Sequence, residues 1–241
     1  MMAVVLAGGL GMRLRPYTMN IPKPLLPLGD QATMEIVLQQ LAGQGFERVV
    51  ITLGHMAQLV EAMLGNGERF GLRIEYAVEV EPLGTAGSLN LVDDLDETFL
   101  VMNGDLLTTI DYGKVVASQE AGQHSATVVL ARREVPIDYG VVYVDHEGCL
   151  ERYEEKPTLH HYVSTGIYAL NRSTVGYVPQ GRFDMPDLIT GLVAAHEKVR
   201  CHITEEYWQD IGRFDDYQRA SADFVADPRR FLPFAAAGPT S

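Results

Sequence analysis

Short apolar runs alternate with amphipathic segments along the first hundred residues. Residues 2–6 are all apolar and lead into two glycines, a pattern typical of a buried strand that ends in a turn. Apolar residues then recur at helical spacing across 33–45, which begins with a threonine and ends on glycine. The same alternation continues through predicted strands at 48–53, 72–78 and 98–105 and predicted helices at 57–64 and 85–94. This order predicts a doubly wound, Rossmann-like α/β fold whose mostly parallel sheet has helices on both faces.

After residue 123 the predicted strands lie closer together, which indicates hairpins and a mixed sheet. The predicted strands are 125–131, 140–145, 149–155 and 165–171, followed by a helix at 185–197, a strand at 198–204 and a helix at 215–225. We expect one domain over residues 1–226 and a loosely ordered tail over 227–241, where prolines and alanines gather. No hexapeptide repeat follows residue 225, so we expect no appended β-helix domain.

Composition narrows the class of protein. The 241 residues carry a formal net charge of −13, which argues against nucleic acid as a partner because nucleic-acid binders present basic faces. No apolar run approaches the roughly 20 residues that a membrane span needs, so a membrane is not expected as a partner either. Two distant cysteines, Cys149 and Cys201, indicate a reducing compartment, and we expect a cytoplasmic protein.

Candidate chemistry begins where the first strand ends. Gly8, Gly9 and Gly11 form a turn of the kind that lets backbone approach a phosphate, although such a turn alone is equally consistent with a simple tight turn. The turn matches neither the dinucleotide fingerprint nor the phosphate loop that ends in Gly-Lys-Ser/Thr. Arg13 and Lys23 follow it, and prolines on both sides of Lys23 restrict its backbone. Two cations beside such a turn favour a polyphosphate ligand.

Three of these features follow predicted parallel strands. The glycine turn, the Gly84-Thr85 turn and Asp105 each stand at the carboxyl end of one strand. Ligands of open α/β sheets bind at this edge, so we expect the three features to share one crevice.

The segment LAGGLGMRLRPYTMNIPKPLLPLG (6–29) resembles the signature of the sugar-1-phosphate nucleotidyltransferases, which has Gly-Gly-x-Gly-x-Arg-Leu followed by Pro-Lys-Pro. Later segments resemble that family's further motifs in the family's order: EPLGTAGSL (81–89), NGD (103–105), DYGVV (138–142), EEKP (154–157), TGIY (165–168) and YWQDIG (207–212). The chain is most similar to the guanylyl branch, the mannose-1-phosphate guanylyltransferases. The resemblance implies transfer of a nucleoside monophosphate from a nucleoside triphosphate to a sugar 1-phosphate, with release of pyrophosphate.

The resemblance also implies a set of site residues. The nucleotide would be bound by Leu6, Ala7, Gly8, Gly9, Gly11, Arg13, Lys23, Glu79, Gly84 and Thr85. Within this set Arg13 would hold the departing pyrophosphate and Lys23 the reacting α-phosphate. Asp105 and Asp210 would bind Mg²⁺, which needs only one or two carboxylates because it keeps several waters. Arg13, Lys23, Asp105 and Asp210 are therefore the expected catalytic residues.

The expected sugar phosphate-binding residues are Gly140, Glu155, Lys156 and Thr165. By resemblance Glu155 would accept hydrogen bonds from sugar hydroxyls and Lys156 would neutralise the sugar phosphate. Many family members have Asn-Ala-Gly where this chain has Ser-Thr-Gly at 164–166, which leaves the sugar open among mannose, glucose, heptose and cyclitol 1-phosphates.

The nucleobase is predicted from one carboxylate. Guanine offers two adjacent donors on its pairing edge, and a carboxylate accepts from such a pair. Glu79 stands where thymidylyl members of the family carry Gln, with Glu81 as the alternative, so GTP is the expected substrate. The alternatives are a uridylyl- or thymidylyltransferase for glucose 1-phosphate, a glycosyltransferase that consumes a sugar nucleotide, and a regulatory homologue that senses one. A homo-oligomer, for instance a dimer, is also expected.

Overall fold

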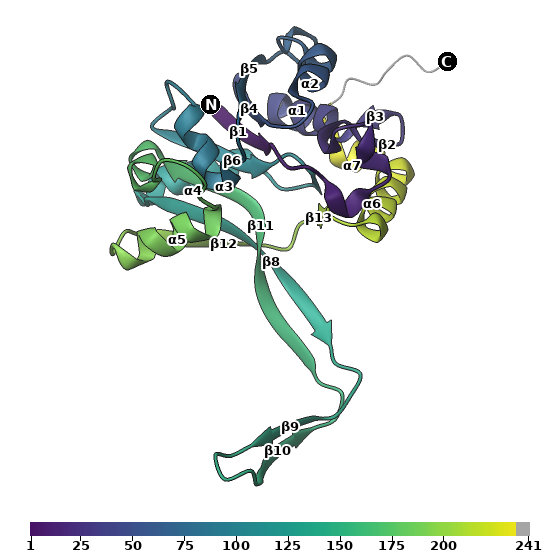
Figure 1. Cartoon of the computed structure of the whole chain (residues 1–241), viewed down its shortest axis with the longest axis vertical. Coiled ribbons are helices and arrows are strands. Elements are labelled where there is room, and N and C mark those ends of the chain that lie inside the picture. Colours follow the sequence, from purple (N-terminus) through teal and green to yellow (C-terminus); the bar gives the residue numbers. More distant parts are fainter. Residues whose placement is uncertain (235–241) are drawn as a thin grey trace.

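The structure is a computed structural model and describes residues 1–234 (Figure 1). Its main sheet has seven strands in the order β12 (Val199–Thr204), β8 (Ala126–Pro136), β11 (Thr158–Asn171), β6 (Thr98–Asn103), β1 (Met2–Ala7), β4 (Arg48–Leu53) and β5 (Arg73–Val78). Strands β6, β1, β4 and β5 run parallel, whereas β11 is antiparallel to both of its neighbours. The predicted mostly parallel, mixed α/β sheet is confirmed.

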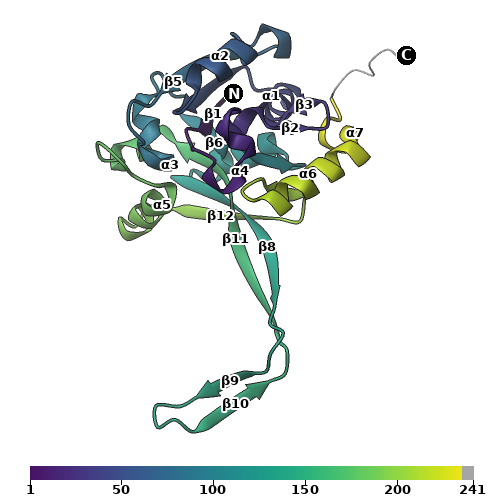
Figure 2. The ribbon, with the colours of Figure 1, turned by 45° about the vertical axis from the view of Figure 1, so that its right-hand side comes forward.

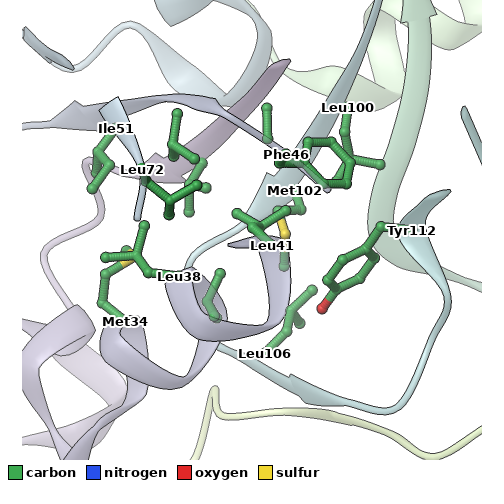
Figure 3. Close-up of a cluster of buried hydrophobic side chains, with 14 of the residues drawn as sticks. Met34, Leu38, Leu41, Phe46, Ile51, Leu72, Leu100, Met102, Leu106 and Tyr112 are labelled. Carbon is green, nitrogen blue, oxygen red and sulfur yellow. The ribbon is translucent and has the colours of Figure 1, made fainter. Parts of the chain in front are cut away.

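Helices cover both faces of this sheet because its central strands are apolar on both sides. Helices α1 (Thr33–Gly43), α2 (Ala57–Leu64) and α4 (Tyr112–Gly122) contribute to one buried cluster, part of which Figure 3 shows. Helices α3 (Gly84–Gly87) and α5 (Met185–Ala194) contribute to a second cluster. Along β1 the side chains alternate between the two, with Ala3 and Val5 in the first and Met2 and Val4 in the second.

A third cluster joins the start and the end of the described chain. Helices α6 (Phe214–Ala226) and α7 (Pro228–Phe231) pack there against Leu14, Leu28 and Ile36. The expected loose tail at 227–241 is therefore wrong at its start, because the side chain of Phe231 is 1% exposed and Asp227 accepts a hydrogen bond from the backbone of Arg230. Residues 235–241 of that tail lie outside the described residues.

Three further small pairings complete the fold: β2 (Pro27–Leu28) with β3 (Gln31–Ala32), β7 (Leu106–Thr108) with β13 (Trp208–Asp210), and β9 (Val141–Val144) with β10 (Leu150–Glu154). The predicted helix over 85–94 is shorter, because the backbone N–H groups of Ala86 and Gly87 both donate to the carbonyl of Phe183 and a 3₁₀ turn follows at Ser88–Leu91. Among residues 1–234 no helix combines the length and the apolar character needed to cross a bilayer.

Strands β8 and β11 are longer than predicted. They stay paired as far as Pro136 and Thr158 and project from the body as a two-stranded ribbon that ends in the β9–β10 hairpin (Figures 1 and 2). We call residues 132–162 the arm. Side chains of β8 change from buried to exposed after Ala131, which marks where the arm leaves the core.

Candidate active site

A cleft of about 920 Å³ opens at the carboxyl ends of β1, β4 and β6, within the usual range of small-molecule sites. Twelve residues singled out from the sequence line it: Leu6, Ala7, Gly8, Gly9, Gly11, Arg13, Lys23, Glu79, Glu81, Gly84, Thr85 and Asp105. The crevice expected from the strand ends is therefore present, and it brings together residues from five separate segments.

The glycine turn has a shape that only glycine adopts without strain. Gly11 has φ of +60°, and a Cβ atom there would lie 2.9 Å from a methyl carbon of Thr18. The hydroxyl of Thr18 donates to the carbonyl of Gly11 at 2.7 Å, and Leu14 is buried in the third cluster. These contacts hold the turn in place on both sides of Arg13, which lines the cleft.

The rigid backbone expected around Lys23 is a 3₁₀ turn. The carbonyl of Pro22 accepts from the backbone of Leu25 at 2.8 Å, and the carbonyl of Lys23 accepts from Leu26 at 3.1 Å. The Lys23 side chain is 13% exposed and its ammonium donates to Oδ2 of Asp105. This cation is thus fixed at the cleft by both its backbone and its ion pair.

Asp105 and Asp210 are brought together by the β7–β13 pairing. Asp210 lies opposite Leu106, and the backbone N–H of Ile211 donates to the carbonyl of Asp105 at 2.9 Å. Burial, and then the negative charge of Asp105, raise the pKa of Asp210, while the positive charges of Lys23 and Arg13 oppose that rise. Two carboxylates and two cations therefore share one electrostatic environment.

These two carboxylates fit a divalent cation. Asp105 already pairs with one positive group, the Lys23 ammonium, and Asp210 is a partly buried carboxylate whose pKa is raised by burial and by the charge of Asp105, so a further positive charge at this place would be favourable. Within residues 1–234 no cluster of three or more His, Cys, Asp or Glu side chains could enclose a metal. Mg²⁺ does not require one, because water and substrate phosphates complete its coordination.

Glu79 stands at the opposite wall of the cleft, after β5. Its backbone N–H donates to the carbonyl of Leu53 at 2.7 Å, and its Oε2 accepts from the backbone of Leu83 at 3.1 Å. Burial raises its pKa although that hydrogen bond opposes the rise. One carboxylate oxygen thus fixes the turn at 79–83, and Oε1 stays beside Gly8.

Thr85 ties its turn to α5. The Thr85 hydroxyl accepts from the backbone of Met185 at 2.7 Å, and its backbone N–H donates to Asp184 at 3.0 Å. Gly84 has φ of +76°, and a Cβ there would lie 2.6 Å from the carbonyl of Phe183. Both residues border the cleft mainly by shaping its wall.

Comparison with known proteins agrees with this geometry. The model of the nucleotidyl transferase family matches residues 2–226. The chain belongs to this family. It is similar to a mannose-1-phosphate guanylyltransferase of Mycobacterium tuberculosis, 34% identical over 92% of this chain and 64% of the relative. It is also similar to a UTP–glucose-1-phosphate uridylyltransferase of Synechocystis, 32% identical over 91% of this chain and 62% of the relative. This nucleotidyl transferase chain therefore spans less than two thirds of the length of these two relatives.

Solved structures have the same fold. HddC from Yersinia pseudotuberculosis has a TM-score of 0.73 at 25% identity, covering 92% of this chain and 99% of that one. A putative glucose-1-phosphate thymidylyltransferase from Bacillus anthracis has a TM-score of 0.76 at 25% identity, covering 99% of this chain and 98% of that one.

The residues expected on the sugar side do not line the cleft of this nucleotidyl transferase. Gly140, Glu155 and Lys156 lie on the arm, where the hydroxyl of Tyr153 donates to Glu155 at 3.0 Å and lies over Gly140. Thr165 is buried, and its hydroxyl donates to the carbonyl of Val129 at 2.9 Å. The side chain of Thr165 is thus engaged in the β11–β8 pairing, and a contact between this residue and the sugar stays a prediction.

Sequence reasoning missed other residues at the cleft. Arg182 lines it from the segment before α5 and adds a third cation, but a lone arginine after Gly181 gave no motif that could have found it. Ser88 also lines the cleft, and its fully buried hydroxyl has no hydrogen-bond partner among residues 1–234. The sequence predicts a regular helix over 85–94, and a serine inside such a helix gives no signal of a position at a cleft.

Proposed function

We propose that this chain transfers a nucleoside monophosphate from a nucleoside triphosphate, GTP in preference, to a sugar 1-phosphate such as mannose or heptose 1-phosphate, giving a nucleoside-diphosphate sugar and pyrophosphate. The observation that supports this most is the meeting of Arg13, Lys23 and Asp105 in a cleft that begins at a glycine turn, with Asp210 held next to Asp105 behind the lining residues. A polyphosphate needs cations at this place, and phosphoryl transfer is catalysed mainly by positioning and charge stabilisation.

In this proposal an oxygen of the sugar phosphate attacks the α-phosphorus in line with the bond to the β-phosphate. A new P–O bond forms, the bond to the bridging oxygen breaks, and pyrophosphate leaves with the electron pair. Lys23 neutralises charge on the α-phosphate, and Arg13 binds the departing pyrophosphate. Asp105 and Asp210 would hold Mg²⁺, which when bound supplies further positive charge to the phosphates.

The preference for GTP rests on Glu79. Its Oε2 keeps a free lone pair beside the Leu83 bond, and Oε1 is not engaged by any hydrogen bond found in residues 1–234. Both oxygens can therefore face the two donors of guanine, N1–H and the exocyclic amine. Relatives that act on GTP and on UTP both match this chain, so the base requires a direct test.

The test is a matrix of nucleoside triphosphates against sugar 1-phosphates, scored by released pyrophosphate, with Lys23→Ala as the blank. We expect turnover with GTP to exceed that with UTP and dTTP, and Glu79→Gln to narrow the preference by about 1–3 kcal/mol, the scale of one bidentate base contact. Preference of the unmodified chain for UTP or dTTP would reject guanine and leave nucleotidyl transfer intact. Absence of pyrophosphate with every pair would reject nucleotidyl transfer itself.

A further inference from the structure

The hairpin at the tip of the arm has one polar and one apolar face. Residues directly opposite in an antiparallel pair share a face, and the register pairs Val142 with Tyr153 and Val144 with Leu150. These four side chains form what we call the hairpin face, and each is exposed, Val144 by 61% and Leu150 by 66%. On the other face the guanidinium of Arg152 lies 3.9 Å from the ring centre of Tyr143.

The arm is not an element that is stable by itself. A two-stranded ribbon is marginal in water without a layer packed on it, and both views show the arm directed away from the sheet and helices (Figures 1 and 2). Three arm tyrosines, Tyr139, Tyr153 and Tyr162, are 80%, 57% and 58% exposed. Since a buried aromatic side chain covers about 150–250 Å², these three alone leave roughly 300–500 Å² of the arm uncovered.

A second uncovered apolar surface lies beside the cleft. The segment 10–23, which we call the mouth segment, exposes Leu10, Met12, Tyr17, Met19 and Ile21, each by more than two fifths. The mouth segment and the other three side chains of the hairpin face add to the area left by the arm tyrosines, toward the roughly 800 Å² that each partner of a stable complex buries. Clustered exposed apolar side chains of this kind are typical of interaction surfaces.

The two surfaces are also complementary in charge. The mouth segment carries three cations, Arg13, Arg15 and Lys23, and no carboxylate. Residues 138–156, which include the hairpin, carry six carboxylates against two cations. The acidic apolar tip of the arm therefore matches the basic apolar rim of the cleft, although within one chain the arm points away from that rim (Figure 1).

We propose that two copies of this chain exchange arms, so that the hairpin face of each copy docks on the mouth segment of the other. The contact is reciprocal, which closes a two-fold dimer and leaves neither surface exposed. The twelve residue steps from Arg132 to Val144 span at most about 40 Å in extended conformation, enough to reach across a neighbouring domain.

The exchange has a consequence for the site. Gly140, Glu155 and Lys156 lie at the base of the hairpin, so docking on a partner's mouth segment carries them to the partner's cleft, beside Lys23 and Asp105. The sugar side of each cleft is then completed by the other copy. This part rests on the proposed function, whereas the docking itself does not.

Docking is tested by sedimentation velocity, which needs no activity. Val144→Lys/Leu150→Glu removes two apolar side chains and puts opposite charges directly across the hairpin, which preserves the hairpin itself. We expect a dimer for the unmodified chain and at least tenfold weaker dimerisation for this variant. The matched control is Leu59→Glu/Met63→Lys, another exposed apolar pair, one helical turn apart on α2, which should remain a dimer. A monomeric unmodified chain, or equal dimerisation of both variants, overturns the exchange.

Completion of the site in trans is tested by mixing two inactive variants. Lys23→Ala has a damaged cleft and an intact arm, and Glu155→Ala/Lys156→Ala has the reverse. After subunits re-equilibrate from an equal mixture, half of the dimers are mixed and one cleft in each has both intact parts, so activity should return to about one quarter of the unmodified value. Activity no higher than the mean of the two separate variants shows that each arm serves its own cleft and overturns this part. If the unmodified chain is inactive with every substrate pair, the proposed function fails, and sedimentation still decides the docking.

Discussion

Replacing Asp210 by Asn should make the protein more stable and much less active. The change keeps the shape of the side chain and removes one negative charge from a half-buried position. Burial and the neighbouring Asp105 hold the pKa of Asp210 above its usual value, so the folded state disfavours the charged form. At neutral pH the charged Asp210 therefore opposes folding, and its removal relieves that cost.

The sign and size follow from proton linkage. Because the folded-state pKa lies above the unfolded value, near 3.9, the folded state holds more protons between the two values, and stability is lost as the pH rises through that window. The gain in unfolding free energy from Asp210→Asn is thus absent at pH values below this window and complete at pH values above it. Each unit of pKa difference is worth about 1.36 kcal/mol, and 1 kcal/mol moves Tm by about 2–4 °C in a chain of this size.

The assay compares Tm at neutral pH, without metal or nucleotide, and pyrophosphate release in the same preparations. Asp215→Asn, which removes an exposed carboxylate from the first turn of α6, is the control and should leave activity unchanged and Tm unchanged or slightly lower. For Asp210→Asn we expect a higher Tm together with a loss of turnover on the order of 10²–10³. A lower Tm would show that Asp210 is a structural hydrogen-bonding group, and full turnover would refute the two-carboxylate metal site.

Other expected outcomes test separate parts of the structure. Lys23→Ala should lower kcat and kcat/KM together, since its charge acts mainly in the transition state; a rise in KM alone would contradict that role. Arg13→Ala should impair the reverse reaction most at limiting pyrophosphate, and an unchanged pyrophosphate dependence would reject its assignment. Thr165→Val should cost about 1–3 kcal/mol of unfolding free energy, measured with urea, at unchanged KM for the sugar phosphate, because it leaves the Val129 carbonyl unsatisfied. Phe231→Ala should cost about 3–5 kcal/mol, and a loss below 1 kcal/mol would show that α7 is dispensable.

The sequence predicted the part of the fold whose rules are local. Residues 48–53 and 57–64 form a strand and a helix with the predicted boundaries, because an apolar run and an amphipathic run are each closed by turn residues. The cleft was predictable for a topological reason, since parallel strands place their carboxyl ends on one edge. Helix α4 was missed because it buries only Tyr112, Val115, Val116 and Gln119, a weak apolar pattern.

The arm could not be predicted from the same rules. The apolar runs that predict strands at 125–131 and 165–171 do not continue into residues 132–136 and 158–163, and an apolar pattern does not fix where a paired ribbon goes after leaving the core. The family motifs at Gly140 and Glu155 therefore predicted sugar phosphate binding but not where in the fold these residues lie. For Thr165 the position in the fold was predictable but the direction of its side chain was not. This threonine lies at a bulge in β11, where contacts with β8 decide whether it faces a ligand or the core.

The charge distribution connects the cleft with the arm. A chain with a net charge of −13 repels polyphosphates at long range. Residues 10–23 carry three cations and no carboxylate, so this segment has a positive local potential. Arg13 and Lys23 line the cleft, whereas Arg15 does not. In the two proposals the first two would bind phosphates and the third would face the partner's acidic hairpin, so a docked hairpin and a bound nucleotide need not compete for the same cation. Since exposed charges are screened over about 8–10 Å and partly buried ones much less, salt should weaken the contact at Arg15 before it weakens the one at Lys23.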